Sequence, residues 1–407
     1  MRRHPLAVLA LLALPLAFPV SAGAQVPQAV TFEEAVTRTL VAHPSLAAAR
    51  RQRAVDVAGV AVAAERPNPD TTVELARETP KRAFGVSFPW ELGGKRARRL
   101  AVAEAAVRTG EAAVEVEGAR LRSEVRRAYF DLALAAARLT TLQDLVTLAG
   151  RARDTARVRF DAGDVPRLEV VEAELAVASA ETDVVLAAGQ VRAARIALNA
   201  LLQWPLDAAP VLVTPIESLA EAGTTGLIER ATARHPELAM LDRSIEEQRA
   251  KVALATSMRR PDLVPGATLT QGAQPEFSVG WRASLSVTLP LFTTHEAGVA
   301  VEQAMLDKLL AERLALSVTM TGMVASSVAA VDAQRGAYLR YRDGVVPRAT
   351  ELETLAQDSY RLGQTGMPAL LRALEATRDV RLRTLDTLVQ LHVALTELER
   401  AAGVPLP

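Results

Sequence analysis

The segment FSVGWRASLSVTL, residues 277–289, alternates apolar side chains with small polar ones, apart from Arg282. A period of two over this length predicts a β-strand with one apolar and one polar face. The pattern also fits a half-buried strand of a soluble sandwich, but the uniformly small, polar second face favours a transmembrane strand, for which about 9–11 residues suffice. Arg282 would then face inward, and the predicted lipid-facing residues are Phe277, Val279, Trp281, Leu285, Val287 and Leu289.

Three weaker strands are predicted around this one. We expect a shorter partner at about 267–271, and a first-half pair at about 71–78 and 84–90 that is short for a full crossing. Four strands cannot close a barrel, and an open sheet edge is not tolerated in lipid. Several chains must therefore share one barrel, and strand arithmetic leaves both a dimer of about eight strands and a trimer of about twelve open.

The chain contains an internal duplication. His43-Pro44-Ser45-Leu46 recurs 192 positions later as His235-Pro236-Glu237-Leu238, and Pro69-Asp70 recurs at the same offset as Pro261-Asp262. The block that begins at Phe160 recurs at Tyr360, with an offset of 200. Eight residues must therefore enter the second copy between these blocks, in a region that includes the strand pair.

The duplication predicts the organisation of the chain. Arg2, Arg3, a short apolar run broken by prolines and an Ala-x-Ala site predict a signal peptide at residues 1–24, rather than a membrane anchor. A first repeat follows at 25–202, with a strand pair at 71–90 and a helical hairpin at 95–202. After a linker or equatorial segment at 203–226 comes a second repeat at 227–402, with a strand pair at 264–291 and a hairpin at 296–402. Residues 403–407 form a C-terminal tail.

The hairpin helices are predicted to be very long. Residues 95–160 contain no proline, and a helix of that length would span roughly 100 Å. Its apolar positions follow the 4–3 spacing of a coiled-coil seam. Pro347 predicts a kink in the corresponding helix of the second repeat. The seam consists of Leu121, Val125, Ala128, Leu132, Ala135, Leu139, Leu142, Val146, Ala149, Arg153, Ala156 and Phe160.

Composition narrows the function classes. The 407 residues carry 47 basic and 47 acidic side chains, which gives no global electrostatic reason to expect nucleic acid as a partner. Aromatic residues make up 4%, and such a composition suits closely packed helices more than an enzyme core. Cysteine is absent, which excludes disulfides, thiolate metal sites and a cysteine nucleophile.

No pattern in the sequence carries bond chemistry. The histidines are not spaced as metal ligands, and His43 and His235 each precede a proline at a predicted helix boundary. Gly93-Gly94-Lys95 lacks the remaining residues of a phosphate-binding loop. We therefore predict no catalytic, cofactor or metal site, and no enzymatic activity.

Taken together, these features resemble the TolC-like outer-membrane efflux proteins. The duplicated order, the two His-Pro-x-Leu segments, the strand-to-helix turn at 88–94 and the turns at 160–173 and 360–373 carry the resemblance over nearly the whole mature chain. It implies a mainly α-helical homotrimer that extends from the outer membrane into the periplasm. A 12-strand β-barrel would continue into a 12-helix α-barrel, made of long antiparallel coiled-coil hairpins.

The resemblance also implies a docking site at the hairpin ends. There the channel would meet a periplasmic adaptor protein, and through it an inner-membrane pump, and the tip would close like an iris. The family places acidic residues on the second hairpin, where this chain has Ala369 and Arg372. The gate candidates are therefore Glu169, Glu172 and Arg372, with a possible Glu172–Arg372 pair between adjacent hairpins. The docking candidates are Phe160, Gly163, Pro166, Tyr360, Gly363 and Gly366.

The predicted function is a passive exit duct of a tripartite efflux or secretion system. A soluble periplasmic coiled-coil adaptor is the main alternative, although it would need only one hairpin and no apolar strand at 277–289. A secreted enzyme with helical decoration is a weaker one, because no constellation of titratable groups is found. Drugs, metal ions and polypeptides all stay open as cargo.

Overall fold

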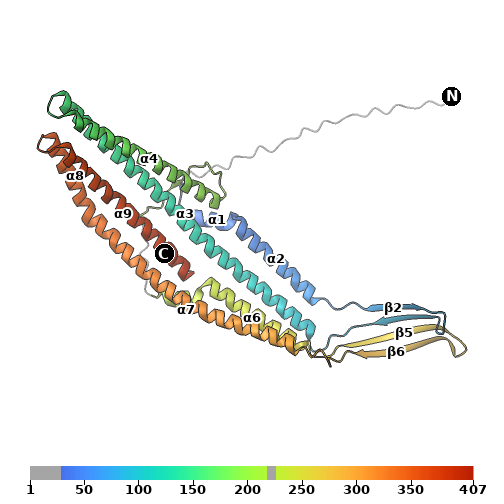
Figure 1. The fold of residues 1–407 in the computed structure, drawn as a ribbon. Helices are drawn as coiled ribbons and strands as arrows, with labels where there is room; N and C mark the ends of the chain where they lie inside the picture. The colour runs from blue at the N-terminus through green and yellow to red at the C-terminus, as the bar shows by residue number, and fades with distance from the viewer. Residues whose placement is uncertain (1–28, 218–225, 407) are drawn as a thin grey trace, which may run out of the picture.

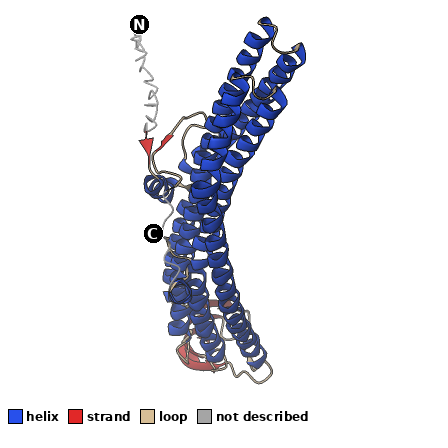
Figure 2. Ribbon diagram, turned by 90° about the vertical axis from the view of Figure 1, so that its left-hand side faces the viewer, coloured by secondary structure: helices blue, strands red, loops and turns tan. Residues whose placement is uncertain are grey.

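The chain is elongated, with a sheet at one end and two helical hairpin turns at the other (Figure 1). This computed structural model describes residues 29–217 and 226–406. The predicted signal peptide, part of the segment at 203–226 and the last residue of the tail lie outside the described residues. Figure 2, turned by 90°, shows that helices form nearly the whole body between the two ends.

The two repeats contain the same elements in the same order. The first comprises β1 Ala29–Val30, α1 Phe32–Ala42, α2 Pro44–Ala64, β2 Asp70–Leu75, β3 Arg82–Ser87, α3 Lys95–Asp161 and α4 Arg167–Leu202. The second comprises β4 Val211–Leu212, α5 Leu227–Arg234, α6 Pro236–Ser257, β5 Leu263–Ala273, β6 Phe277–Val287, α7 Glu296–Arg340, the π-helical segment η1 Tyr341–Val345, α8 Val346–Arg361 and α9 Met367–Ala402.

The offset between the repeats changes along the chain. It is 192 at the starts of α2 and α6, 201 at the starts of α3 and α7, and 200 at the starts of α4 and α9. The second strand hairpin and its connections are therefore nine residues longer, and the long helix is one residue shorter. This difference accounts for the eight added residues that the sequence predicts, and it places the extra length in the strands.

The four longer strands form one antiparallel sheet in the order β2-β3-β5-β6. β5 is longer than predicted, and it pairs with β6 from Ala273↔Phe277 to Leu263↔Val287. The predicted extension of β6 to Leu289 is wrong, since the strand ends at Val287. Pro290 follows directly after Leu289 and has no N–H to donate to a ladder, which accounts for the early end.

The first strand pair is as short as predicted, but its bounds differ. β2 and β3 have six residues each, and β3 ends at Ser87 rather than at Trp90. Trp90 instead makes an isolated bridge to Leu263 of β5. Pro89 interrupts β3 in the same way that Pro290 interrupts β6.

The two faces of the sheet differ as the alternation predicts. One cross-strand row consists of Val73, Phe84, Leu269 and Trp281, all of them exposed. The adjacent row on the opposite face consists of Thr72, Gly85, Thr268 and Arg282. Arg282 therefore lies on the small, polar face. Trp281, with 82% of its surface exposed, lies on the apolar one.

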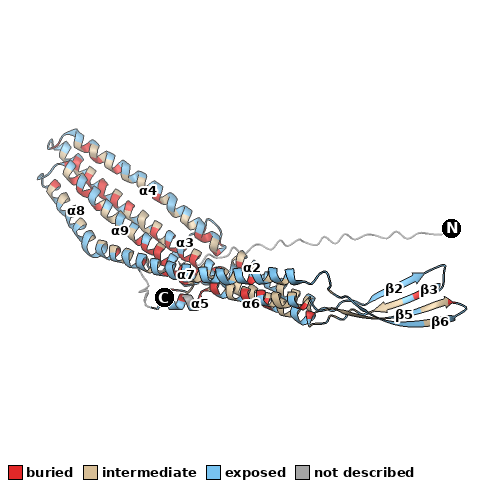
Figure 3. Cartoon of the chain, turned by 60° about the horizontal axis from the view of Figure 1, so that its bottom comes forward, coloured by how far each residue is buried: buried red, intermediate tan, exposed pale blue. Residues whose placement is uncertain are grey.

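The main core lies midway along the helices. Phe32 of α1 packs against Tyr129 and Phe130 of α3, and the His392 ring stacks on Phe130 at 4.0 Å. The Tyr129 hydroxyl donates to the Val30 carbonyl at 2.9 Å, which attaches β1 and its parallel partner β4 to the bundle. Figure 3 shows the buried residues gathered along the central helices, while most of the sheet is exposed. The equatorial segment therefore packs on the helices rather than linking the repeats loosely.

The predicted seam of α3 is realised along its length. Of its twelve members only Phe160, at the end of the helix, is exposed. In the second repeat α7, η1 and α8 form one continuous helix of 66 residues. η1 ends two residues before Pro347, where the missing N–H and the bulk of the ring disturb an α-helix; the helix is thus π-helical beside the position of the predicted kink.

Within residues 29–217 and 226–406, three helices contain a window that is apolar enough, by length and composition alone, to cross a membrane: α3, α4 and the continuous α7–α8 helix. In the structure these helices pack along one another, because α3 contacts α4 and α7 contacts α9. Their apolar windows are rich in alanine and valine, which suit close packing between helices as well as contact with lipid.

Both His-Pro motifs are N-caps. The His43 ring accepts from the Ser45 N–H at 3.3 Å, and the His235 ring accepts from the Glu237 N–H at 3.2 Å, each ahead of a proline at the first helical position. The second ring nitrogen of His235 lies 3.3 Å from the Arg400 carbonyl oxygen. His235 is buried, whereas His43 is half-buried. A capping role explains the motif without a metal.

A His235→Asn variant is expected to resist acid better than the parent chain. Burial lowers the pKa of His235 below its usual value, so the unfolded chain binds more protons than the native chain as the pH falls. The stability due to the neutral ring is therefore present above about pH 6.5 and is lost below it, whereas asparagine caps the helix without titrating. Thermal melts at pH 7.5 and 5.5 measure the effect. His43→Asn controls for the cap exchange, and an unchanged pH dependence in His235→Asn would contradict the assignment.

Candidate functional site

The two hairpin turns have the same backbone structure. Gly163 and Gly363 adopt left-handed conformations, with φ of 81° and 71°. Their N–H groups donate to the carbonyls of Phe160 and Tyr360 at 2.9 and 3.0 Å. Glycine adopts positive φ without a Cβ penalty, which explains its place at both reversals. Pro166 and Gly366 are the N-cap residues of α4 and α9, so all six predicted docking positions lie in or beside the turns.

The equivalent aromatic residues Phe160 and Tyr360 differ in environment. Tyr360 is buried, with 1% of its surface exposed, whereas Phe160 is 41% exposed. The Tyr360 hydroxyl donates to Glu169 Oε2 at 3.0 Å. The Arg159 guanidinium lies 4.7 Å from the centre of the Tyr360 ring, and its Nη1 donates to the Tyr360 carbonyl at 3.1 Å. Tyr360 of α8 is therefore held by both α3 and α4.

We call this group, Arg159, Glu169 and Tyr360, the tip link, because it joins the two hairpins of one chain near their ends. Burial, with the hydrogen bond to Glu169, raises the pKa of Tyr360 to about 12. The hydroxyl thus stays protonated and keeps donating throughout the neutral pH range. A hydrogen bond to a charged acceptor contributes about 1.5–3 kcal/mol.

Apolar side chains surround the turns on the outside. Besides Phe160, the residues Val158, Leu168, Val171 and Leu362 are exposed, and Val158 is the most exposed of them at 69%. Isolated exposed apolar residues are ordinary, but a group at one end of a molecule marks a contact surface. We call Val158, Phe160, Leu168, Val171 and Leu362 the tip patch.

The other two gate candidates are not joined to each other. Arg372 Nε donates to its own helix at the Pro368 carbonyl, at 3.1 Å, and the residue is exposed. Glu172 Oε2 is buried and has no hydrogen-bond partner among the described residues. It lines a groove of about 440 Å³ between α4 and α9, where Asp183 and Arg378 form an ion pair. A Glu172–Arg372 pair between neighbouring chains stays a prediction.

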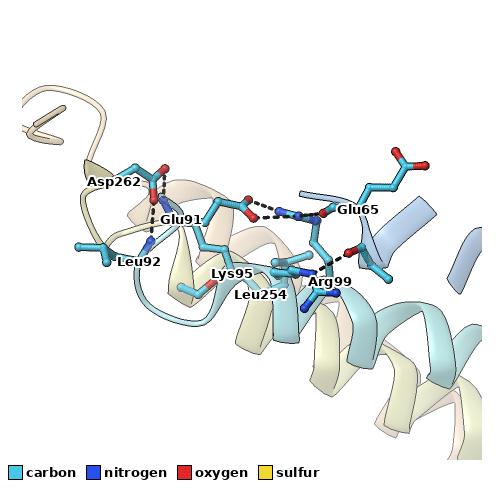
Figure 4. Close-up of polar contacts among 10 residues, drawn as sticks. Glu65, Glu91, Leu92, Lys95, Arg99, Leu254 and Asp262 are labelled. Atoms are coloured by element: carbon cyan, nitrogen blue, oxygen red, sulfur yellow. Dashed lines mark hydrogen bonds and ion pairs between the residues drawn. The ribbon is translucent and has the colours of Figure 1, made fainter. Parts of the chain in front are cut away.

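A second polar cluster lies where the sheet meets the helices (Figure 4). Asp262, just before β5, accepts from the Leu92 N–H at 3.1 Å and from Lys95 Nζ at 2.8 Å. Lys95 is buried, with 6% of its surface exposed. Arg99 binds Glu91 through both of its terminal nitrogens, and it donates to the Glu65 carbonyl at 3.2 Å. The cluster therefore holds the exit of the first strand pair and the entry of the second to the start of α3.

Some of these residues were not found from the sequence. The sequence assigns no contact to Lys95, Arg99 or Arg159, because no periodic pattern distinguishes a basic side chain that binds a carboxylate or an aromatic ring from one that is only solvated. Across the described residues there is no group of three or more histidine, aspartate or glutamate side chains placed to hold a metal ion.

Comparison with known protein families and sequences gives two results. The family described as outer membrane efflux protein matches residues 35–202. The cobalt-zinc-cadmium resistance protein CzcC of Cupriavidus metallidurans is 24% identical over 385 residues, which cover 92% of this chain and 90% of that protein.

Solved structures share the fold. CusC superposes with a TM-score of 0.78 at 15% identity, and 92% of each chain is covered. The outer membrane protein VceC of Vibrio cholerae gives a TM-score of 0.75 at 16% identity, covering 92% of this chain and 97% of that one. The open state of the MtrE outer membrane channel of Neisseria gonorrhoeae gives 0.74 at 17% identity, covering 92% and 89%.

Proposed function

We propose, from the premise that this chain belongs to the TolC-like outer membrane efflux protein family, that it is the exit duct of a tripartite efflux system. As a member of that family it is an outer-membrane efflux channel that extends into the periplasm, and it is not an enzyme. What we add as a proposal is docking to a periplasmic adaptor, coupling through it to an inner-membrane pump, and assembly as a homotrimer.

The tip patch supports adaptor docking. It places exposed apolar side chains of both hairpins at the end farthest from the sheet, where a partner that reaches across the periplasm would arrive. The tip link lies beside it, so an adaptor that binds the patch better when the hairpins separate would shift the tip toward an open state. The energy for export comes from the pump, because a passive duct supplies none.

The sheet supports a shared barrel. Within the described chain the edge strands β2 and β6 each pair on one side only, and lipid does not tolerate an unpaired edge. Three chains would supply twelve strands, as expected from the family, and would surround a lumen lined by the polar face that carries Arg282.

For cargo we propose divalent metal cations as the first class to test, because the relative CzcC is named for resistance to cobalt, zinc and cadmium. A deletion strain is expected to lose resistance to one or more of these metals and to regain it from the plasmid-borne gene. If the strain lost resistance to antibiotics but not to these metals, the cargo would be assigned to antibiotics instead of metal cations. No change in any resistance, or recovery of the protein in the soluble periplasmic fraction, would contradict the function.

A substitution in the tip patch tests adaptor docking separately from cargo. Phe160→Asp places a charge in the tip patch, and it is expected to abolish resistance and adaptor cross-linking while the outer-membrane level stays normal. Val57→Asp is the matched control, because Val57 is exposed on α2, away from the tip. Wild-type resistance in Phe160→Asp would remove the tip patch as the docking surface.

A further inference from the structure

The two edges of the chain carry exposed apolar side chains that nothing in the described chain covers. The central helix α3 contacts α2, α4, α6 and α9. On one edge, α2 and α4 expose Val62, Leu175 and Val185, and on the other, α7 and α8 expose Val301, Leu314 and Leu355. Strands β2 and β6 end the sheet on the same two edges. The first edge belongs to the first repeat and the second edge to the second.

The repeats are equivalent in backbone detail, not only in order. Gly94 and His295 are both left-handed N-caps, with φ of 72° and 59°, and they precede α3 and α7. Gln203 and Gly403 are both left-handed C-caps, with φ of 55° and 63°. Corresponding residues can therefore be assigned by the offset of 192 before the strand hairpin and 201 after it.

Inside the chain, the exit strand of the first repeat pairs with the entry strand of the second. The Phe88 N–H donates to the Pro265 carbonyl at 2.9 Å, and Trp90 and Leu263 exchange two bonds of 2.7 and 3.1 Å. Ser87 and Gly266 lie opposite each other one position before the bonded Phe88–Pro265 pair, and hydrogen-bonded pairs alternate with non-bonded ones in an antiparallel ladder. They are therefore a non-hydrogen-bonded pair, in which side chains approach most closely.

We propose that β6 of one chain, together with the residues that directly follow it, pairs antiparallel with β2 of a second copy in this same register, with Thr288 opposite the partner's Glu74 and Leu291 opposite the partner's Thr71. The offset of 201 takes Ser87 to Thr288 and Trp90 to Leu291. The offset of 192 takes Glu74 to Gly266 and Thr71 to Leu263. The inference rests on the proposed homotrimer and specifies its contact surface.

The register keeps both faces of the sheet continuous. Glu74 lies on the polar face, since it is two residues from Thr72, and Thr288 is in phase with Arg282. A slip of one residue would exchange the apolar and polar faces, which the lipid forbids. The nearest alternative register that keeps each face on its own side is a slip of two residues, which places Ser286 opposite the partner's Glu74.

Charges at the base of the sheet also fit. At the proposed interface between chains, the partner's Asp70 takes the place of Asp262, and Glu296 takes the place of Lys95. The Lys95–Asp262 ion pair therefore cannot simply be repeated there, because two carboxylates would face each other. Arg259 Nη2 lies 2.9 Å from Glu296 Oε1, and the two side chains are 49% and 65% exposed. The guanidinium therefore offers the partner's Asp70 the cation that Lys95 offers Asp262, while the Thr293 N–H takes the place of the Leu92 N–H.

Paired cysteines test the register, because the chain has no cysteine of its own. Glu74→Cys/Thr288→Cys and Ala76→Cys/Ser286→Cys both place thiols opposite each other in the proposed register. Glu74→Cys/Ser286→Cys does so only after the two-residue slip. Ala83→Cys/Thr270→Cys, an observed pair inside one chain, controls for oxidation. Each single-cysteine variant controls for chance collisions.

Oxidised outer membranes are expected to give covalent dimers and closed trimers on non-reducing gels for the first two variants. The slip variant and the single cysteines should stay monomeric, and the control pair should link without a change in oligomer size. Preferential cross-linking of the slip variant would overturn the register. The register would also be overturned if neither proposed pair cross-linked, provided that both variants restored resistance and the separate control variant Ala83→Cys/Thr270→Cys did form its disulfide. Recovery of the parent chain as a soluble protein would instead refute the proposed function.

Discussion

A Tyr360→Phe channel is expected to conduct in planar bilayers without its adaptor far more often than the parent channel. The change removes only the hydroxyl that donates to Glu169 at 3.0 Å, and it keeps the buried ring under Arg159. A hydrogen bond to a charged acceptor is worth about 1.5–3 kcal/mol, and each 1.4 kcal/mol is a factor of ten in population. We therefore expect the open probability to rise by roughly 10- to 100-fold.

Two further variants sharpen this prediction, which rests on the proposed gating of the tip. Tyr341→Phe removes the hydroxyl of a tyrosine in η1, outside the tip link, and should leave conductance unchanged. Glu169→Gln keeps an acceptor but removes its charge, so its effect should be smaller than that of Tyr360→Phe. If Tyr360→Phe and Tyr341→Phe behave alike, the link does not hold the tip closed.

The second large effect is expected at the junction of sheet and helices. Asp262→Ala removes the carboxylate that binds Lys95 Nζ at 2.8 Å and leaves the ammonium group of a lysine that is only 6% exposed. Removing one partner of a buried pair costs about 3–5 kcal/mol, and the lower end applies because the Asp262 side chain is 37% exposed. We expect a clear loss of heat-resistant oligomer in membrane extracts.

The double variant Lys95→Met/Asp262→Ala separates the buried charge from the rest of the contact. Methionine keeps much of the aliphatic stem of lysine without its ammonium group, so the double variant should be more stable than Asp262→Ala alone. Arg53→Met/Glu111→Ala, an exposed ion pair of 2.8 Å between α2 and α3, provides the comparison and should be nearly neutral. A double variant as unstable as Asp262→Ala would show that the Leu92 N–H contact matters more than the charge.

Much of the architecture is predictable because it is periodic. The seam from Leu121 to Ala156, the apolar face of β6 and the helix boundaries at the two His-Pro motifs are all local patterns, and each is confirmed. Strand ends were predicted less well. Leu289 continues the alternation, but the pairing with β5 stops at Val287, ahead of Pro290, which has no N–H to donate to β5.

The tip shows why positional equivalence is not enough. Phe160 and Tyr360 occupy the same place in the two repeats, so the sequence predicts one role for both. In the structure Tyr360 is buried between Arg159 and Glu169, and Phe160 is exposed. The difference comes from which neighbour each turn packs against within the chain, and a repeat alignment does not contain that information.

The sequence alone therefore determines the order and type of the elements of this channel, the lengths of its long helices and which faces are apolar. Those features depend on spacings of two, three or four residues. The tertiary structure decides which charges are buried and paired, because such pairs join residues far apart in sequence. Lys95 meets Asp262 across 167 positions and Tyr360 meets Glu169 across 191, so each contact depends on how the two repeats pack side by side.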